Sequence, residues 1–335
     1  MSIPSQMAAW QVKAQGEPAE VLELVEAPVP SPGPGQVLVE VWSAALNFPD
    51  VLMARGQYQE RPALPYTPGV ELCGMIVAVG PGVDAHRVGE RVIGTPVLPH
   101  GSLARYAIAV AAEVFPAPPG LDDASAAALH ISYQTGWFGL YRRAALRVGE
   151  TLLVHGAAGG VGSAAVQLGK AAGARVVAVV GGGDKVAAAQ ALGADVVVDR
   201  TREDVVAAVR QATDGRGVDV VYDPVGGAAY EASTKVIAFE GRIVVVGFTS
   251  GTIPQPALNH ALVKNYGVLG LHWGLYRLRD PELVRRAHED LSNLAGVGAV
   301  RPLVADRLRL EDAAAGLTRL AAGSVVGRLT VQLTG

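Results

Sequence analysis

The sequence is poor in sulfur, and Cys73 is the only cysteine among its 335 residues. A single cysteine excludes a disulfide within the chain and the four-cysteine lobe that binds structural zinc. Long apolar runs are also missing, because no uncharged stretch reaches the roughly 18–20 residues that a membrane-spanning helix needs. The first residues, MSIPSQ, lack the basic and apolar regions of a secretory signal. We therefore expect a soluble, cytoplasmic protein.

Charge of either sign is balanced along the chain, which has 28 basic and 31 acidic residues and no block of one sign. Such a composition lacks the positive footprint of proteins that bind nucleic acids or membrane surfaces. Half of the residues are apolar, which is enough for a sizeable core. We expect neither a nucleic acid nor a membrane as partner.

The chain changes character near residue 125, and its length predicts two domains. Before this point, short alternating runs such as QVLVEVW (36–42), MIVAVG (75–80) and RVIGTPV (91–97) predict a compact, mostly-β unit. From residue 151, apolar β-branched runs alternate with helical segments, as in a parallel sheet covered on both faces. Six such runs match a doubly wound dinucleotide-binding fold. They are residues 151–157, 174–180, 195–200, 219–225, 242–248 and 266–273.

The stretch VHGAAGGVGSAA, residues 154–165, joins the first of these runs to a predicted helix. Small side chains in such a turn let the backbone approach a pyrophosphate, and the helix N-terminus offers N–H groups to it. The motif is A-x-G-x-x-G, formed by Ala157, Gly159 and Gly162, with alanine in place of the usual first glycine. Its place between a strand and a helix favours a phosphate site over an ordinary glycine-rich turn.

The end of the second run indicates which dinucleotide binds. NAD-binding folds usually carry an acidic side chain there for the ribose hydroxyl, but this chain has Val180, then Gly181 to Gly183 and Lys185. A 2′-phosphate needs space and positive charge, and an acid would repel it. Arg200, after the third run, adds a second cation or stacks on the adenine. The pattern predicts NADPH, unless both cations are ordinary surface residues.

Four stretches of the chain together resemble the medium-chain dehydrogenase/reductase superfamily: AALNFPDVLMARGQY, LPYTPGVELCGMIVAVGPGV, HGAAGGVGSAAVQLGKAAGA and VVYDPVGG. They are most similar to its zinc-free quinone oxidoreductase (zeta-crystallin-like) branch. The resemblance implies an α/β protein with a GroES-like, mostly-β catalytic domain (residues 1–127 and 274–335) and a doubly wound Rossmann NADPH-binding domain (128–273). It also implies a homodimer, or else a homotetramer.

Zinc-dependent members of the superfamily provide a negative test. They bind catalytic zinc through a cysteine, a His–Glu pair and a further cysteine or similar ligand. At the matching positions this chain has Asn47, then Val70 with Glu71, then Ile131. An amide, a valine and an isoleucine cannot assemble the nitrogen and sulfur ligands that zinc requires. We expect no metal, and we interpret Glu71 as a structural carboxylate that pairs locally.

The resemblance also implies roles for individual residues. Asn47 and Asp50 of the N-F-x-D segment would lie beside the nicotinamide, and Tyr58 matches a proton-donating or polarising tyrosine of enoyl-thioester reductases. These three residues are the catalytic candidates, although Asn47 also suits a turn and Tyr58 an ordinary loop. Arg200 stands where relatives often carry a tyrosine. The implied cofactor-binding residues are Asn47, Thr135, Gly159, Gly160, Val161, Gly162, Gly181, Lys185, Arg200, Gly247, Phe248 and Arg328.

The implied reaction is hydride transfer from NADPH to an electron-poor acceptor. Without zinc to polarise a carbonyl, quinones and related conjugated carbonyl compounds are the favoured acceptors. One alternative is an NADPH-dependent enoyl-thioester (enoyl-CoA or carrier-bound) or enone reductase, for which Arg55 and Arg61 near Tyr58 would contribute to a basic groove. A second alternative is a non-catalytic NADPH-binding protein.

Overall fold

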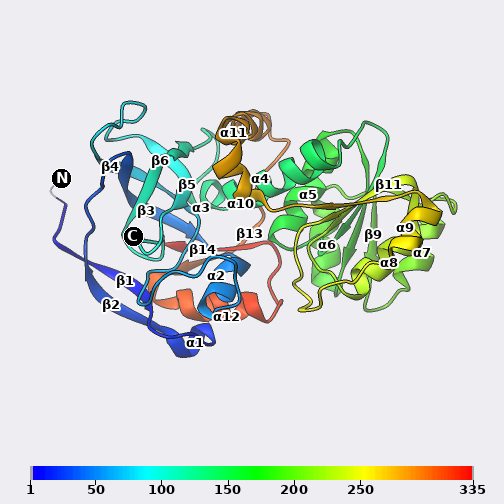
Figure 1. The fold of residues 1–335 in the computed structure, drawn as a ribbon, viewed down its shortest axis with the longest axis horizontal. Coiled ribbons are helices and arrows are strands. Elements are labelled where there is room, and N and C mark those ends of the chain that lie inside the picture. Colours follow the sequence, from blue (N-terminus) through cyan, green and yellow to red (C-terminus); the bar gives the residue numbers. More distant parts are fainter. Residues whose placement is uncertain (1–2, 334–335) are drawn as a thin grey trace. The chain divides into compact units, whose positions relative to one another are not determined.

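The computed structural model describes residues 3–333, and the chain divides into two compact units (Figure 1). Unit 1 comprises residues 1–131 and 302–335, and unit 2 comprises residues 132–301. Within the described residues, no helix is long and apolar enough to cross a membrane.

Unit 1 is built on a six-stranded sheet in the order β13-β14-β3-β4-β5-β6, in which β3 also pairs with β6. The strands β3, β4, β5 and β6 therefore close on themselves around an apolar core that includes Val37, Val39 and Leu72. A separate antiparallel pair, β1 and β2, completes the β structure. The strands are β1 (Gln6–Val12), β2 (Leu22–Pro28), β3 (Gln36–Ala45), β4 (Leu72–Val79), β5 (Arg91–Pro96), β6 (Tyr106–Pro116), β13 (Val304–Arg309) and β14 (Arg328–Gln332).

Short helices complete unit 1, and the chain's last strand joins its sheet. β14 pairs antiparallel with β3, with Thr330 opposite Ala45 and Gln332 opposite Ser43. The C-terminal tail is therefore part of the first domain, as expected for a GroES-like unit. The helices are α1 (Pro18–Val21), α2 (Phe48–Ala54), α3 (Asp123–Ala127), the single turn η2 (Leu310–Asp312) and α12 (Ala313–Ala321).

Unit 2 contains a six-stranded parallel sheet in the order β12-β11-β10-β7-β8-β9. Counted from β7, this is the 3-2-1-4-5-6 order of dinucleotide-binding folds. β7 and β10 are neighbours, and the chain reverses direction across the sheet between them. In such folds, ligands bind at this reversal, outside the carboxyl ends of the strands. The strands are β7 (Thr151–His155), β8 (Arg175–Val180), β9 (Val196–Asp199), β10 (Val218–Asp223), β11 (Ile237–Val245) and β12 (Gly267–Gly270).

Helices alternate with these strands, so the sheet core of Leu153, Val177 and Ile243 is fully buried. The predicted doubly wound α/β fold is confirmed. The helices are α4 (His130–Trp137), the π-helix η1 (Phe138–Arg143), α5 (Gly160–Ala171), α6 (Gly183–Ala191), α7 (Val205–Ala212), α8 (Ala228–Val236), α9 (Leu258–Lys264), α10 (Trp273–Arg279) and α11 (Pro281–Gly296).

The units differ from the expected domain boundaries mainly on the C-terminal side. Residues 274–301 were expected in the first domain, but their contacts place them in unit 2, and the first boundary falls at residue 131 instead of 127. Gln134 Nε2 donates to the carbonyl oxygen of Val284 at 3.0 Å. Gln167 Nε2 donates to the carbonyl oxygen of Arg301 at 3.0 Å. These bonds tie α11 and the segment after it to α4 and α5, and the chain returns to the first sheet only at β13.

Candidate functional site

The turn between β7 and α5 has the geometry of a phosphate-binding turn. Close packing requires glycine at position 162, because a Cβ there would collide with the carbonyl oxygen of Gly156. At Gly159, which caps the helix, that same oxygen is the nearest atom to an added Cβ, at 3.3 Å, so the rest of this position is open. Gly160 and Val161 begin the helix, whose first N–H groups have no helical acceptor and suit phosphate oxygens.

The turn also shows where the missing first glycine of the motif has gone. Gly156 adopts a φ of +58°, which side chains disfavour, and it therefore makes the sharp turn at the end of β7. Ala157, in the usual glycine position, has ordinary backbone geometry and donates its N–H to the carbonyl oxygen of Val179 at 3.1 Å. The glycine that the turn needs lies one residue earlier than the motif suggested.

A positively charged surface lies at the carboxyl end of β8. An added Cβ at Gly181 would lie 2.9 Å from Nη2 and 3.1 Å from Cζ of Arg200, so this guanidinium covers the glycine. Arg200 is exposed, and Lys185 lies half-buried in the first turn of α6. β8 itself ends in the buried Val180. Where NAD-binding folds carry an acidic side chain, this chain therefore has two cations and a glycine that leaves space beside them.

One acidic residue near this surface was missed by the sequence analysis. Asp199 ends β9, and its Oδ1 accepts from the N–H of Gly182 at 3.0 Å and from the N–H and hydroxyl of Thr201 at 3.0 and 2.7 Å. These bonds, that of Gly182 first, lower the pKa of Asp199. The carboxylate fixes the glycine turn that follows β8. An acid at the end of a buried run, directly before Arg200, was the available signal.

The remaining cofactor candidates of unit 2 occupy separate places. Gly247 and Phe248 follow the carboxyl end of β11, the sheet edge at which doubly wound folds bind ligands. The Phe248 side chain is 37% exposed and lies against Gly226, where an added Cβ would be 3.0 Å from its ring. Thr135 is buried in α4. Their roles stay predictions.

In unit 1, Asn47, Glu71 and Arg328 form a closed ring of hydrogen bonds. Asn47 Nδ2 donates to Glu71 Oε2 at 2.9 Å, and Arg328 Nη1 donates to Asn47 Oδ1 at 2.9 Å. Arg328 Nη2 closes the ring by a direct ion pair with Glu71 Oε2. The three residues are 4%, 0% and 5% exposed. The ring fixes the amide of Asn47, with its oxygen toward the cation and its nitrogen toward the anion.

Further donors complete this network. Glu71 Oε1 accepts from the N–H of Ile131 at 2.6 Å, and Asn47 Nδ2 also donates to the carbonyl oxygen of Ala45 at 3.0 Å. Burial raises the pKa of Glu71, whereas Arg328 and the hydrogen bonds oppose this shift. Both amide hydrogens of Asn47 are therefore engaged inside unit 1.

Asp50 joins the network at the start of α2 and is 0% exposed. Its Oδ2 accepts from the N–H of Asn47 at 2.9 Å, and its Oδ1 accepts from the N–H of Gly69 at 3.0 Å. Burial raises the pKa of Asp50 to about 7, although these two N–H groups and Arg328 act in the opposite direction. Asp50 thus changes its protonation state close to neutral pH.

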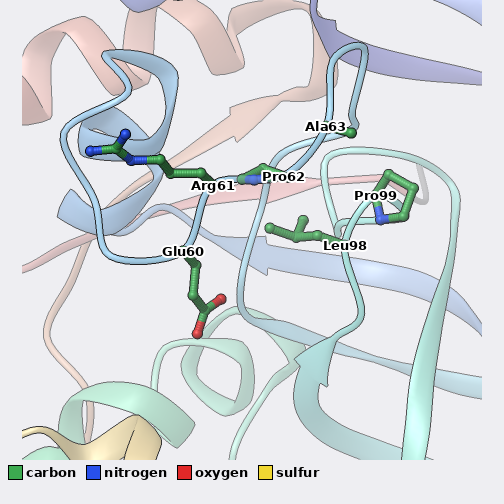
Figure 2. Close-up of a pocket in the computed structure, with 6 residues that line it drawn as sticks. All are labelled: Glu60, Arg61, Pro62, Ala63, Leu98 and Pro99. Atoms are coloured by element: carbon green, nitrogen blue, oxygen red, sulfur yellow. The ribbon is translucent and has the colours of Figure 1, made fainter.

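Tyr58 lies half-buried in the loop after α2 and packs against a small cluster of Val12, Met53 and Tyr66. Leu98 packs against the same cluster and also lines a pocket of about 340 Å³ (Figure 2). In Figure 2 the charged ends of Glu60 and Arg61 point away from Leu98 and Pro99. The pocket is lined by Glu60, Arg61, Pro62, Ala63, Leu98 and Pro99.

The basic groove suggested by Arg55 and Arg61 is reduced to one cation. Arg55 Nε and Nη2 donate to the two carboxylate oxygens of Glu17 at 2.9 and 2.8 Å. Such a bidentate pair occupies the whole fork of the guanidinium. Arg61 remains exposed at the pocket.

Comparisons with known proteins agree with this architecture. A family model described as alcohol dehydrogenase GroES-like domain matches residues 33–119, and one described as zinc-binding dehydrogenase matches residues 160–289. Quinone oxidoreductase-like protein 2 of Bos taurus is 36% identical over 291 residues, which are 86% of this chain and 83% of that protein. The homolog from Nematostella vectensis is 40% identical over 257 residues, 76% of this chain and 70% of that protein.

The chain belongs to the medium-chain dehydrogenase/reductase superfamily, in its zinc-free quinone oxidoreductase-like branch. Solved structures of this group resemble the present chain over nearly its whole length. A Pseudomonas syringae quinone oxidoreductase is 31% identical with a TM-score of 0.89, covering 97% of this chain and 99% of that chain. A mycobacterial protein solved in complex with NADPH has the same identity, TM-score and coverage.

Zinc, which the description of one family model names, does not fit this quinone oxidoreductase-like chain. The amide of Asn47 is bonded to Glu71 and Arg328, and Ile131 contributes only its backbone N–H. In residues 3–333, no group of three or more His, Cys, Asp or Glu residues could hold a metal ion. Glu71 pairs locally, as the sequence analysis expected.

The structure therefore gathers the candidates of this reductase-like chain into two sets. Asn47, Asp50 and Arg328 come together in one buried network of unit 1. Gly181 and Arg200 meet at the end of β8. No pattern in the sequence indicated that Arg328, expected near the cofactor, pairs with Glu71.

Proposed function

We propose that this chain is an NADPH-dependent, zinc-independent oxidoreductase that reduces quinones or related conjugated carbonyl compounds. The observation that carries the proposal is the Arg200 guanidinium over Gly181, with Lys185 in the first turn of the helix that follows, α6. This arrangement suits a ribose 2′-phosphate, because it offers space and two cations. NADPH, when bound, supplies the hydride. The turn at Gly159 and Gly162 would hold the pyrophosphate.

The acceptor class rests on different support. A conjugated carbonyl compound needs no metal to polarise it. The residues that stand at the zinc-ligand positions of zinc-dependent relatives, such as Asn47 and Ile131, do not suit zinc. The pocket beside the Tyr58 cluster presents Leu98 and Pro99, while the charges of Glu60 and Arg61 point away from them. Flat, apolar acceptors fit such walls better than a phosphate-bearing thioester. The printed names of similar proteins, quinone oxidoreductase and its homologs, agree with this choice.

The test is the oxidation of NADPH and NADH by the purified protein with benzoquinone, phenanthrenequinone, a medium-chain enoyl-CoA and a simple enone. We expect rapid turnover of the quinones with NADPH. The variants Lys185→Ala and Arg200→Ala should weaken NADPH binding on the order of tenfold each and leave NADH unchanged. Arg202→Ala is the matched control, because Arg202 is a neighbouring arginine with an exposed side chain. Its Nε lies 4.0 Å from Asp199 Oδ2, at the outer limit of an ion pair. Equal losses for both dinucleotides would reject the 2′-phosphate site.

A second candidate is the reduction of enoyl thioesters. It is favoured by the position of Tyr58, which matches a tyrosine of enoyl-thioester reductases. One similar protein is by name an acid synthase, the phthioceranic/hydroxyphthioceranic acid synthase of Mycobacterium tuberculosis, which is 38% identical over 237 residues, 71% of this chain and 11% of that protein. Tyr58 would then donate or orient a proton. Turnover of enoyl-CoA alone, with a large loss in Tyr58→Phe, would establish this candidate. NADPH binding without any turnover would instead support a non-catalytic role.

We also propose that the protein forms a homodimer. β12 is an edge strand of its sheet, and α9, the helix that precedes it in the chain, contains no buried residue. Leu258, Leu262 and Val263 are at least 75% exposed, an apolar surface that a second copy would cover. Leu262→Asp should yield a monomer in light scattering, whereas Val148→Asp, at an isolated residue that is 83% exposed, should not. A monomeric wild type would reject the proposal.

A further inference from the structure

Positions that carry zinc ligands in zinc-dependent relatives are occupied here by a network around Glu71. Asn47 Nδ2 and the Ile131 N–H both donate to its carboxylate, and Arg328 pairs with it. We propose that the Arg328 guanidinium is the internal cation of this centre, that it takes the structural role of a metal, and that it positions Asn47. The expected effect of Arg328 on turnover rests on the proposed function, but its expected effect on the stability of the network does not.

The position of the guanidinium is fixed from two sides. Arg328 is the first residue of β14, and its N–H donates to the carbonyl oxygen of Leu303 at 2.7 Å. The preceding Gly327 has a φ of +80°, and an added Cβ there would collide with the same carbonyl oxygen. The backbone before the arginine therefore tolerates only glycine, and it delivers the side chain into the interior, where Glu71 holds it.

The bonding pattern determines what Asn47 can do. Its two amide hydrogens are bonded to Glu71 and Ala45, and its oxygen accepts from Arg328. A rotated amide would place its NH₂ against the guanidinium and its oxygen against the carboxylate, which electrostatics forbids. Asn47 therefore has no hydrogen left to donate to an acceptor carbonyl. Arg328 and Glu71 act through Asn47 as positioning residues, and they also join α2, β4 and β14.

If Arg328 only filled space, the loss of its side chain would not be repaired by a free cation. If it is the cation of this centre, a free cation should repair the loss. Removal of the guanidinium alone leaves the buried Glu71 carboxylate without its cation, and such a charge is stabilised by any cation that fits. The Arg328→Ala variant should therefore bind free guanidinium ion in the vacated space. Lysine is a poor substitute, since a single ammonium cannot reach both Asn47 Oδ1 and Glu71 Oε2 as the fork does.

The test compares Arg328→Ala, Arg328→Lys and the control Arg105→Ala, whose arginine is half-exposed and paired with Glu40 at 3.1 Å. We expect Arg328→Ala to lower the thermal midpoint and to reduce kcat/KM on the order of tenfold or more. Millimolar guanidinium chloride should restore both quantities in this variant, and an equal concentration of sodium chloride should not. Arg105→Ala should change little and show no rescue.

The thermal readout needs neither cofactor nor acceptor, so it separates this inference from the proposed function. A folded Arg328→Ala variant with a normal thermal midpoint would overturn the inference, as would a lowered midpoint that guanidinium ion does not raise. Rescue by zinc ion would also overturn it, because the network would then be a metal site. Rescue of the midpoint in a protein that turns over no quinone would retain the inference and reject the proposed function.

Discussion

The two units handle charge in opposite ways. In unit 1, Asp50, Glu71 and Arg328 are almost completely buried; Glu71 pairs with Arg328, and Asp50 accepts from the backbone N–H of Asn47. In unit 2, Arg200 is exposed and covers a glycine, and Gly160 and Val161 at the start of α5 are half-buried. The polar groups of the buried network are largely bonded within the protein, whereas the exposed Arg200 guanidinium is accessible to a ligand. The first region thus holds the protein's own geometry, and the second is the region that we propose recognises the cofactor.

The comparison predicts that charge removal is most damaging in unit 1. Glu71→Ala leaves Arg328 buried without its anion, which should lower the free energy of unfolding by about 3–5 kcal/mol. Urea denaturation followed by intrinsic tryptophan fluorescence, to which Trp10 and Trp42 of unit 1 contribute, would measure the loss. Glu23→Ala is the control, because Glu23 is exposed and 3.7 Å from Lys13. Similar stability of the two variants would contradict a buried ion pair.

In unit 2 the sensitive feature is backbone packing at the turn between β7 and α5, the proposed phosphate site. Gly162→Ala places a Cβ against the Gly156 carbonyl, and such overpacking costs about 1–3 kcal/mol. We expect weaker binding of NADPH and NADH alike, measured by calorimetry, because the pyrophosphate is common to both. Gly296→Ala, in α11, serves as control, since an added Cβ there meets no atom within 4 Å. Unchanged binding by Gly162→Ala would argue against this turn as the phosphate site.

Local patterns explain why unit 2 was the more predictable region. Alternating strands and helices predicted its topology. The glycines and cations of the candidate cofactor site lie within a few residues of the strand ends that position them. The ring of unit 1 joins residues up to 281 positions apart, and no spacing in the sequence reports such a pair. For the same reason no pattern in the sequence predicted the pairing of Arg328 with Glu71, or the contacts that group residues 274–301 with unit 2.

The titration of Asp50 sharpens the comparison through pH. Its pKa is raised from 3.8 to about 7 in the folded state, so the folded protein binds this proton more tightly than the unfolded chain. The stabilisation is complete below pH 3.8 and is lost as the pH rises through 7. Asp50→Asn should remove a slope of up to about 1.4 kcal/mol per pH unit between these values.

The difference between wild type and Asp50→Asn isolates this group. His155, buried in unit 2, acts in the opposite direction, because burial lowers its pKa and its stabilisation is lost as the pH falls. Its contribution cancels when the two proteins are compared at each pH. Parallel curves of unfolding free energy against pH would show that Asp50 is ionised throughout and that its two N–H donors outweigh burial.

The smallest expected effect belongs to the open surface of unit 2. Gly181→Ala displaces the Arg200 guanidinium, which lies 2.9 Å from the position of the new Cβ, and an exposed side chain can move at low cost. Stability should therefore change by less than about 0.5 kcal/mol. NADPH affinity should fall on the order of tenfold, with NADH affinity retained. Because the same substitution would be neutral if Arg200 were an ordinary surface residue, equal affinities before and after would assign the 2′-phosphate to Lys185 alone.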